Sequence, residues 1–168
     1  MKNKLHHSFY AGPLSVLLAV FAASGAKAQE TGHEVCRSIG GFTPEQLGDR
    51  ENHNLFISQG SCEDTEGLLA GAVENDTGVV EWDGPHAKEL SGFGVVRKPG
   101  ATIAFQDLDG RVELTMTDGK PTGWTATGHS VVTLATGPWS ARLGRTSSWT
   151  VKSTGPNTYE TNYTMDSK

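Results

Sequence analysis

Short apolar runs alternate with polar, turn-forming residues from about Gly67 onward, and helical spacing is scarce. Within 111–117, for example, Val112, Leu114 and Met116 occupy every second position, with charged residues and threonines between them. This period of two predicts strands with one buried and one solvent-exposed face, as in antiparallel sheets. The strands predicted in this way are 67–74, 79–82, 90–97, 101–106, 111–117, 122–134, 145–152 and 158–165.

The segments between these runs carry the residues that tight turns require. Glycine supplies positive φ angles, and proline presets φ and is excluded from central strands. About eight strands at this spacing are typical of a barrel or a sandwich. We predict an all-β fold, a single antiparallel eight-stranded β-barrel, because glycines 123 and 128 would let the long strand 122–134 bend around a corner. The predicted turns include Asn75-Asp76-Thr77-Gly78, Lys98-Pro99-Gly100, Asp109-Gly110 and Asp118-Gly119.

Residues 1–28 have the pattern of a secretory signal peptide. Lys2 and Lys4 precede an apolar run over 14–23, and Ala26-Lys27-Ala28 offers a small-x-small cleavage site. The run of about ten residues is shorter than the roughly 20 that span a bilayer, although an uncleaved anchor helix is the alternative. The predicted organisation is a signal peptide over 1–28, an irregular N-terminal segment over 29–66 and a β-barrel over 67–168. We therefore expect a secreted or periplasmic protein with no membrane span.

The charge of the chain changes when this leader is removed. The remaining residues include 11 basic and 19 acidic side chains, a net charge of −8. Affinity for nucleic acid depends on lysine and arginine side chains that meet phosphates. An acidic chain without a basic stripe is a poor match for that role, so we exclude nucleic acid as a partner.

Cys36 and Cys62 are the two cysteines of the chain, and both follow the predicted leader. In an exported protein an even pair most simply forms one disulfide. A bond that closes this 26-residue loop would stabilise the fold by roughly 3 to 4 kcal/mol in the chain-entropy model. A redox pair would more typically have Cys-x-x-Cys spacing.

A short motif near the C-terminus resembles a known family. Gly137-Pro138-Trp139-Ser140-Ala141-Arg142-Leu143-Gly144 follows Ala135-Thr136 and places an aromatic residue and a second glycine two and seven positions after the first. This is similar to the TG-x-[aromatic]-x₄-G hairpin of allene-oxide-cyclase and dirigent-type barrels. The resemblance covers the C-terminal half and implies an eight-stranded, often secreted barrel. It carries over no catalytic residue to this sequence.

Two arginines are candidates for ligand binding. Arg97 shares strand parity with Phe93, and Arg145 shares strand parity with Trp149. If these aromatic rings face the barrel interior, both guanidinium groups line it or its rim, where a ligand carboxylate would fit them. The alternative is that each arginine is solvated or pairs with an acid such as Glu81.

Three tryptophans complete the predicted ligand site. Trp82 and Trp139 lie beside turns, where an amphipathic ring can close a barrel end or stack on a ligand. Trp149 lies on the same face as Arg145, whereas Trp124 has the parity of a core residue. Packing in the core is the alternative for each of them.

No motif identifies a metal, a cofactor or a catalytic group. His86 has Asp83 and Glu89 three residues to either side, which is not a typical ligand spacing. The sequence has no Gly-x-Ser-x-Gly elbow, and pairs such as Asp107 with Asp109 have the character of turn residues. We predict no metal and no cofactor, and the pattern leaves open whether the protein is an enzyme.

The leading functional expectation is a barrel that binds a small, largely apolar molecule or an amphipathic acid in its lumen. An isomerase or cyclase that uses the same lumen to position a substrate is the alternative, since such catalysis needs few recognisable motifs. A structural or interaction protein with a filled barrel is a further alternative.

Overall fold

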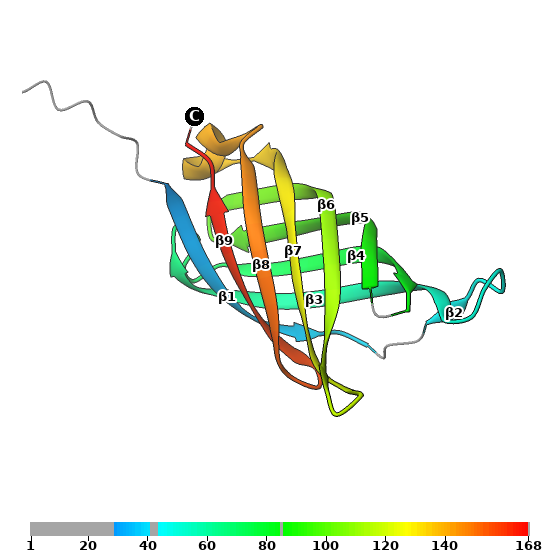
Figure 1. Cartoon of the computed structure of the whole chain (residues 1–168). Helices are drawn as coiled ribbons and strands as arrows, with labels where there is room; N and C mark the ends of the chain where they lie inside the picture. The colour runs from blue at the N-terminus through cyan, green and yellow to red at the C-terminus, as the bar shows by residue number, and fades with distance from the viewer. Residues whose placement is uncertain (1–28, 41–43, 85, 168) are drawn as a thin grey trace, which may run out of the picture.

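The computed structural model describes residues 29–40, 44–84 and 86–167, which form a sheet of nine strands and one short helix (Figure 1). The predicted signal peptide lies outside the described residues. The elements are β1 (Glu30–Ser38), β2 (Glu45–Gln46), β3 (His53–Gly67), β4 (Val73–Asp83), β5 (His86–Lys98), β6 (Ala101–Thr117), β7 (Lys120–Ala135), the 3-10 helix η1 (Gly137–Arg142), β8 (Thr146–Gly155) and β9 (Thr158–Met165).

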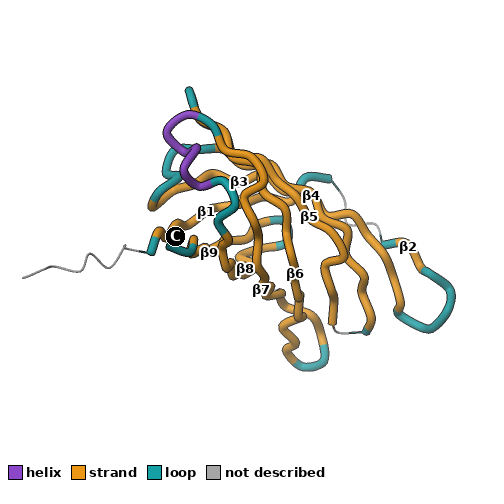
Figure 2. The backbone as a smooth tube through the Cα atoms, turned by 90° about the horizontal axis from the view of Figure 1, so that it is seen from above, coloured by secondary structure: helices purple, strands orange, loops and turns teal. Residues whose placement is uncertain are grey.

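The sheet closes on itself into an eight-stranded antiparallel barrel, which confirms the predicted fold class. From β3 to β9 each strand pairs with the next one along the chain, and β1 pairs with both β9 and β3. The short β2 is added outside this ring, on β3, and Figure 2 shows it far from η1. Closure removes the exposed sheet edges that would otherwise invite pairing with other chains.

The N-terminal part of the barrel corrects the predicted domain boundary at residue 67. β1 and β3 fall almost entirely within 29–66, and only the stretch between them keeps the irregular character predicted for the whole segment. The Cys36–Cys62 disulfide is confirmed, and it joins directly opposed residues of β1 and β3. It therefore cross-links the two strands whose pairing closes the barrel.

Two of the predicted turns are confirmed and two are wrong. The chain turns at Pro99-Gly100 and at Asp118-Gly119, where the two glycines and Asp118 have positive φ angles. Residues 75–78 instead lie inside β4, and 109–110 lie inside β6 beside a bulge. In both places the aspartates and glycines that suggested a turn belong to a continuous strand.

Glycines on the inner face make room for the large side chains of the barrel interior. Gly128 lies opposite Gly110 on β6 and opposite Trp149 on β8. Gly94 faces Phe105 in the same way, and a Cβ atom at Gly94 would lie only 2.3 Å from that ring. The interior is thus built from large residues packed against strand backbone.

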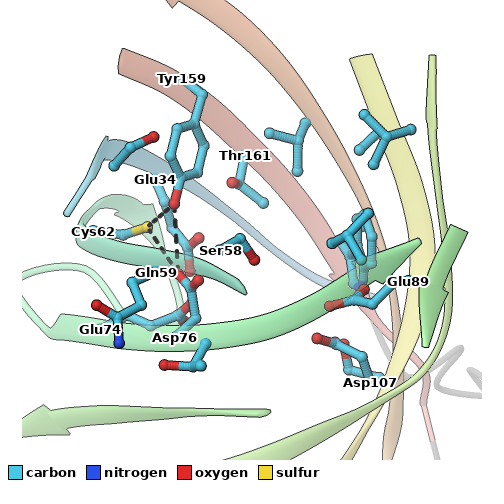
Figure 3. Close-up of a pocket in the computed structure, with 18 of the residues that line it drawn as sticks. Glu34, Ser58, Gln59, Cys62, Glu74, Asp76, Glu89, Asp107, Tyr159 and Thr161 are labelled. Atoms are coloured by element: carbon cyan, nitrogen blue, oxygen red, sulfur yellow. Dashed lines mark hydrogen bonds between the residues drawn. The ribbon is translucent and has the colours of Figure 1, made fainter. Parts of the chain in front are cut away.

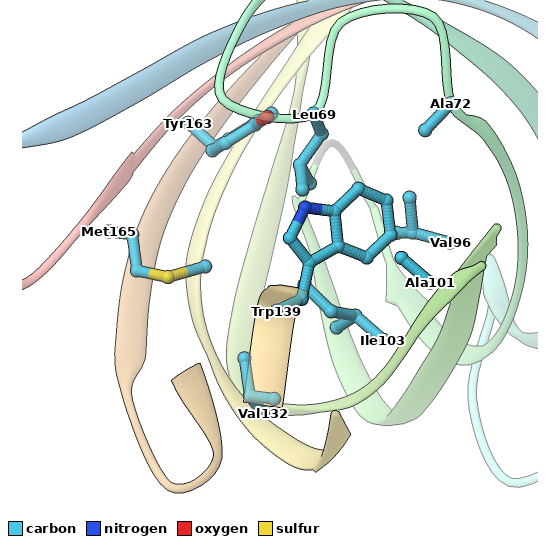
Figure 4. Packing of buried hydrophobic residues seen from close by; sticks show 9 residues of the cluster. All are labelled: Leu69, Ala72, Val96, Ala101, Ile103, Val132, Trp139, Tyr163 and Met165. Carbon is cyan, nitrogen blue, oxygen red and sulfur yellow. The ribbon is translucent and has the colours of Figure 1, made fainter. Parts of the chain in front are cut away.

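One end of the barrel is closed by a cluster of apolar side chains (Figure 4). Trp139 of η1, which is 3% exposed, lies at its centre, because Gly137 and Pro138 begin the helix directly after β7 and turn it over the barrel end. The cluster consists of Leu69, Ala72, Val96, Ala101, Ile103, Val132, Trp139, Tyr163 and Met165. Among the described residues, no helix is long and apolar enough to cross a membrane.

The inner glycines give a direct test of this packing. A Cβ atom at Gly128 would lie 2.3 Å from the Asp109 carbonyl oxygen and 2.3 Å from Trp149. We expect Gly128→Ala to destabilise the protein by about 1 to 3 kcal/mol, because the backbone of β6 cannot yield without distorting the ladder. Thr127→Ala, at the exposed neighbouring position, should change stability by less than about 0.5 kcal/mol in the same denaturant titration. Equal stability of the two variants would contradict this account of the interior.

Candidate ligand-binding cavity

The barrel encloses a cavity of about 470 Å³. Its floor is the apolar cluster described above, with Leu69, Val96 and Ile103 among the lining residues. At the other end the lining reaches the exposed side chains of Ile39 and Ile57. The cavity is therefore closed at the η1 end and opens between the start of β3 and the loop from β8 to β9.

The wall near the opening is aromatic and aliphatic. Phe56 and Trp82 pack against each other there, with ring centroids 6.0 Å apart. Trp124 packs against Tyr159, with centroids 5.5 Å apart. Val112, Leu114, Ala126 and Val151 fill the wall between these pairs.

Carboxyl groups form a belt inside the barrel, with Glu34, Glu74 and Asp76 on one side and Glu89 and Asp107 on the other (Figure 3). They come from five of the eight strands and have inward-facing positions in each. None of the described residues that line the cavity is a lysine, an arginine or a histidine. We call these six residues the carboxyl belt: Glu34, Asp64, Glu74, Asp76, Glu89 and Asp107.

Glu34, Glu74 and Asp76 form one side of the belt. Glu34 is 4% exposed, and burial together with the nearby charge of Asp64 raises the pKa of its carboxyl to about 8. Burial and the charge of Glu34 raise the pKa of Glu74 well above its ordinary value, and the protonated Glu74 donates a hydrogen bond to Glu34. Burial raises the pKa of Asp76 to about 6, although the Tyr159 hydroxyl donates a 3.5 Å hydrogen bond to it.

Asp64 is the belt member that does not line the cavity, and it lies beside Glu34 with an exposed fraction of 1%. The Tyr163 hydroxyl donates a hydrogen bond of 3.1 Å to Oδ1, whereas Oδ2 is buried without a hydrogen-bond partner among the described residues. Burial raises the pKa of Asp64 to about 6, and the positive charge of Lys98 acts weakly against that rise. Lys98 itself lies over the Trp139 ring at the closed end and does not line the cavity.

Glu89 occupies a cradle of backbone on the other side of the belt. Cβ atoms at Gly78, Gly92 or Gly110 would lie 2.2 to 2.6 Å from its carboxyl oxygens, so only glycine leaves room for this group. Burial, followed by the charges of Asp107 and Asp76, raises the pKa of Glu89 to about 8. Glu89 is thus protonated at neutral pH and donates a hydrogen bond to Asp107.

Asp107 is the most strongly hydrogen-bonded member of the belt. The Ser130 hydroxyl donates to its Oδ1 at 2.6 Å, and the Trp149 indole also donates to the carboxylate. These donors favour the charged form, but burial outweighs them and raises the pKa of Asp107 above its ordinary value. Glu89 and Asp107 therefore place a neutral and an ionisable carboxyl side by side.

The two arginines predicted to bind a ligand do not line the cavity. Phe93 and Arg97 share a face of β5, as predicted, but it is the outer one, and the inference that they face the interior is wrong. Arg145 is 10% exposed, and it donates to Glu30 at 2.9 Å and to the Asp166 carbonyl at 2.6 Å. It ties the closed end of the barrel together, which matches the alternative that an acid pairs with it.

The tryptophans of the predicted site are divided between the two ends. Trp82 and Trp149 line the cavity, as does Trp124, which had been assigned to the core. Trp139 belongs to the apolar cluster of the closed end and does not line the cavity. Their predicted contact with a ligand stays a prediction.

The sequence pattern did not reveal the carboxyl belt, because acids and glycines on an inner face resemble turns. Asp76 and Asp107 each occur within two residues of glycine, asparagine or a second aspartate, which is the usual composition of a turn. Glu34 and Asp64 lie in strands whose inner faces are not apolar, so the alternation that marks a strand is missing there. A period of two in acids and glycines would have been the available signal.

The belt is a poor match for a metal ion. Within the described residues, each compact group of three candidate ligand atoms includes Cys36 or Cys62, whose sulfurs are joined in the disulfide. A disulfide sulfur is not the thiolate that binds metals. His86, considered above with Asp83 and Glu89, is exposed and does not line the cavity, whereas Glu89 does.

Comparisons of the chain with protein-family models, with curated proteins and with solved structures found no match. Fold and site therefore define the class on their own: a single-domain, disulfide-linked antiparallel β-barrel with a carboxyl-lined internal cavity. The disulfide indicates a non-reducing environment of the extracellular type.

The carboxyl belt predicts that the fold is more stable in mild acid than in mild alkali. The pKa of Glu34 and of Glu89 rises from 4.5 to about 8 on folding. The contribution of each group to the stability of the folded state is therefore fully present below pH 4.5 and is lost progressively as the pH rises to 8. His53, whose pKa is raised by Asp49 and Glu81, acts in the same direction. We expect the Tm at pH 5 to exceed that at pH 8 by roughly 5 to 10 °C.

The matched variant is Glu34→Gln with Glu89→Gln, which should flatten this pH dependence and raise the Tm at pH 8. The control is Glu63→Gln with Glu66→Gln, at exposed positions of β3. This control should have the same pH dependence of the Tm as the wild type. A Tm that is constant or rises from pH 5 to pH 8 would show that the belt is not held protonated.

Proposed function

We propose that this protein is an exported barrel that binds a small, largely apolar molecule in its lumen. The observation that carries the proposal is the internal cavity of about 470 Å³, closed at the η1 end and open at the other. Pockets for small ligands have volumes of about 300 to 1,000 Å³ and mostly apolar walls with a few placed polar groups. The cavity has this size, and its polar groups are concentrated in one belt.

The form of the wall supports binding rather than a purely structural role. A filled barrel would bring apolar side chains from all strands into contact along the whole axis. Here apolar contact of that kind is concentrated in the cluster around Trp139, whereas the cavity continues past this cluster along the axis of the barrel. Around the opening, Phe56, Trp82 and Trp124 offer aromatic surface for a ligand body.

Export is supported by two independent features. Residues 1–28 have the sequence pattern of a secretory leader, and the Cys36–Cys62 bond requires a non-reducing environment to persist. A binding protein of this kind would meet its ligand outside the reducing cytosol. The similarity of 137–144 to allene-oxide-cyclase and dirigent-type barrels agrees with such a setting.

Lumen binding can be tested with N-phenyl-1-naphthylamine, an apolar fluorophore that is uncharged at neutral pH. We expect a saturable blue-shifted emission with one site per chain. Ala126→Phe, which places a large ring at a buried, cavity-lining position, should weaken binding at least tenfold because it fills the lumen. Thr125→Phe adds the same ring to the exposed face of the same strand and should leave binding unchanged.

Both variants are first compared with the wild type by circular dichroism and thermal melting. If folded Ala126→Phe binds the fluorophore as tightly as the wild type, the dye does not enter the lumen and the proposal is wrong. The proposal also fails if the wild-type protein shows no saturable binding.

A further inference from the structure

We infer that the ligand is an organic cation, a protonated primary amine on an apolar body, with its ammonium group held by the carboxyl belt. This inference rests on the proposed lumen binding and names the chemical class of the ligand. It replaces the amphipathic acid suggested by the two arginines, since neither arginine lines the cavity.

The first support is the one-sided charge of the lumen. Five carboxyl groups of the belt line the cavity and the sixth does not, and none of the described lining residues is basic. Arg97 lies on the outer face, Arg145 is paired with Glu30, and Lys98 lies over Trp139 at the closed end. A buried carboxylate needs a counter-charge or a proton. A ligand cation would supply the counter-charge that the described lining residues do not provide.

The second support is the buried oxygen of Asp64. Its Oδ2 has no hydrogen-bond partner among the described residues, and because the residue is only 1% exposed, water does not readily take that place. A buried carboxylate oxygen without a partner is costly even though Tyr163 and Glu34 both donate hydrogen bonds to the Asp64 carboxylate, and the charge of Asp64 acts directly on Glu34, which lines the cavity. A cation held beside Glu34 would stabilise both groups.

The order of surfaces along the lumen favours an amine with an apolar body. The opening is aromatic, and the carboxyl belt lies farther inside the barrel, between the opening and the apolar floor. A primary ammonium has three N–H donors, which suits several carboxyl oxygens arranged around one space. The Tyr159 hydroxyl and the Trp149 indole N–H each donate to a carboxylate of the belt, to Asp76 and to Asp107, which fixes the positions of these acceptor groups.

The same geometry argues against a bare divalent ion as the occupant. The compact ligand groups among the described residues depend on disulfide sulfurs, which do not bind metals as thiolates do. An aromatic opening of this extent would also contribute nothing to a metal site. The buried carboxyls, which weaken the fold at neutral pH, are explained by a cationic ligand that pairs with them.

The test compares ligands with one apolar body and different head groups. Octylamine, octan-1-ol, octanoate and octyltrimethylammonium are titrated into the full-length protein by calorimetry at pH 7.5. We expect octylamine to bind at least tenfold more tightly than octan-1-ol, and octanoate to bind most weakly. Octyltrimethylammonium, which has the charge without N–H donors, should fall between octylamine and octan-1-ol.

Variants of matched charge locate the interaction. Glu34→Gln with Glu74→Gln should reduce octylamine affinity at least tenfold and leave octan-1-ol binding unchanged, which also shows that the lumen is still formed. Glu63→Gln with Glu66→Gln removes two exposed carboxyls of β3 and should change neither affinity.

A second readout is the proton balance. Pairing with an ammonium ionises a belt carboxyl, which releases its proton to the buffer, so octylamine should bind at least tenfold more weakly at pH 5 than at pH 7.5. The carboxyls involved are Glu34, Asp64, Glu74, Asp76, Glu89 and Asp107, and the positive charge of Lys98 acts on Asp64. Octan-1-ol binding should not depend on pH in this way.

Each outcome separates the inference from the proposed function. Equal binding of octylamine and octan-1-ol, or an amine preference that survives Glu34→Gln with Glu74→Gln, overturns the inference and leaves lumen binding in place. Stoichiometric binding of CaCl₂ or MnCl₂ that displaces octylamine overturns it in favour of a metal site. If octylamine, octan-1-ol and the neutral fluorophore all fail to bind, both the inference and the proposed function are wrong.

Discussion

The structure depends on burying carboxyl groups inside a closed barrel, where the described residues that line the cavity include no basic side chain. Removing an ion from water is costly, so each of these groups takes up a proton, shares one with a neighbour, or meets a cation. Glu74 shares a proton with Glu34, and Glu89 shares one with Asp107, on opposite sides of the belt. The chemistry of the lumen is a consequence of accommodating these pairs.

The barrel accommodates the belt because stabilising contacts lie elsewhere, at the closed end and at the disulfide between β1 and β3. The apolar cluster around Trp139 and the Glu30 ion pair with Arg145 hold the closed end. The disulfide cross-links β1 to β3, where the sheet closes. The middle is then free to carry glycines and acids, which favour neither burial nor strand formation.

The sequence revealed the barrel more fully than its interior, for one physical reason. Strands with an apolar inner face, such as 111–117 with Val112 and Leu114, alternate clearly and were found within β6. Strands whose inner face carries Glu34, Asp64 or Asp76 lack that alternation, so they were read as irregular segments or turns. Arg97 was misplaced because parity shows which residues share a face but does not show which face is buried.

The most direct test of this account is a titration of the individual carboxyl carbons by NMR in the protein without added ligand. The account predicts that Glu34 and Glu89 titrate near pH 8, well above the ordinary value of about 4.3 for a glutamate side chain. Ordinary pKa values for Glu34 and Glu89 would contradict it, because they would show that the belt is solvated or already neutralised.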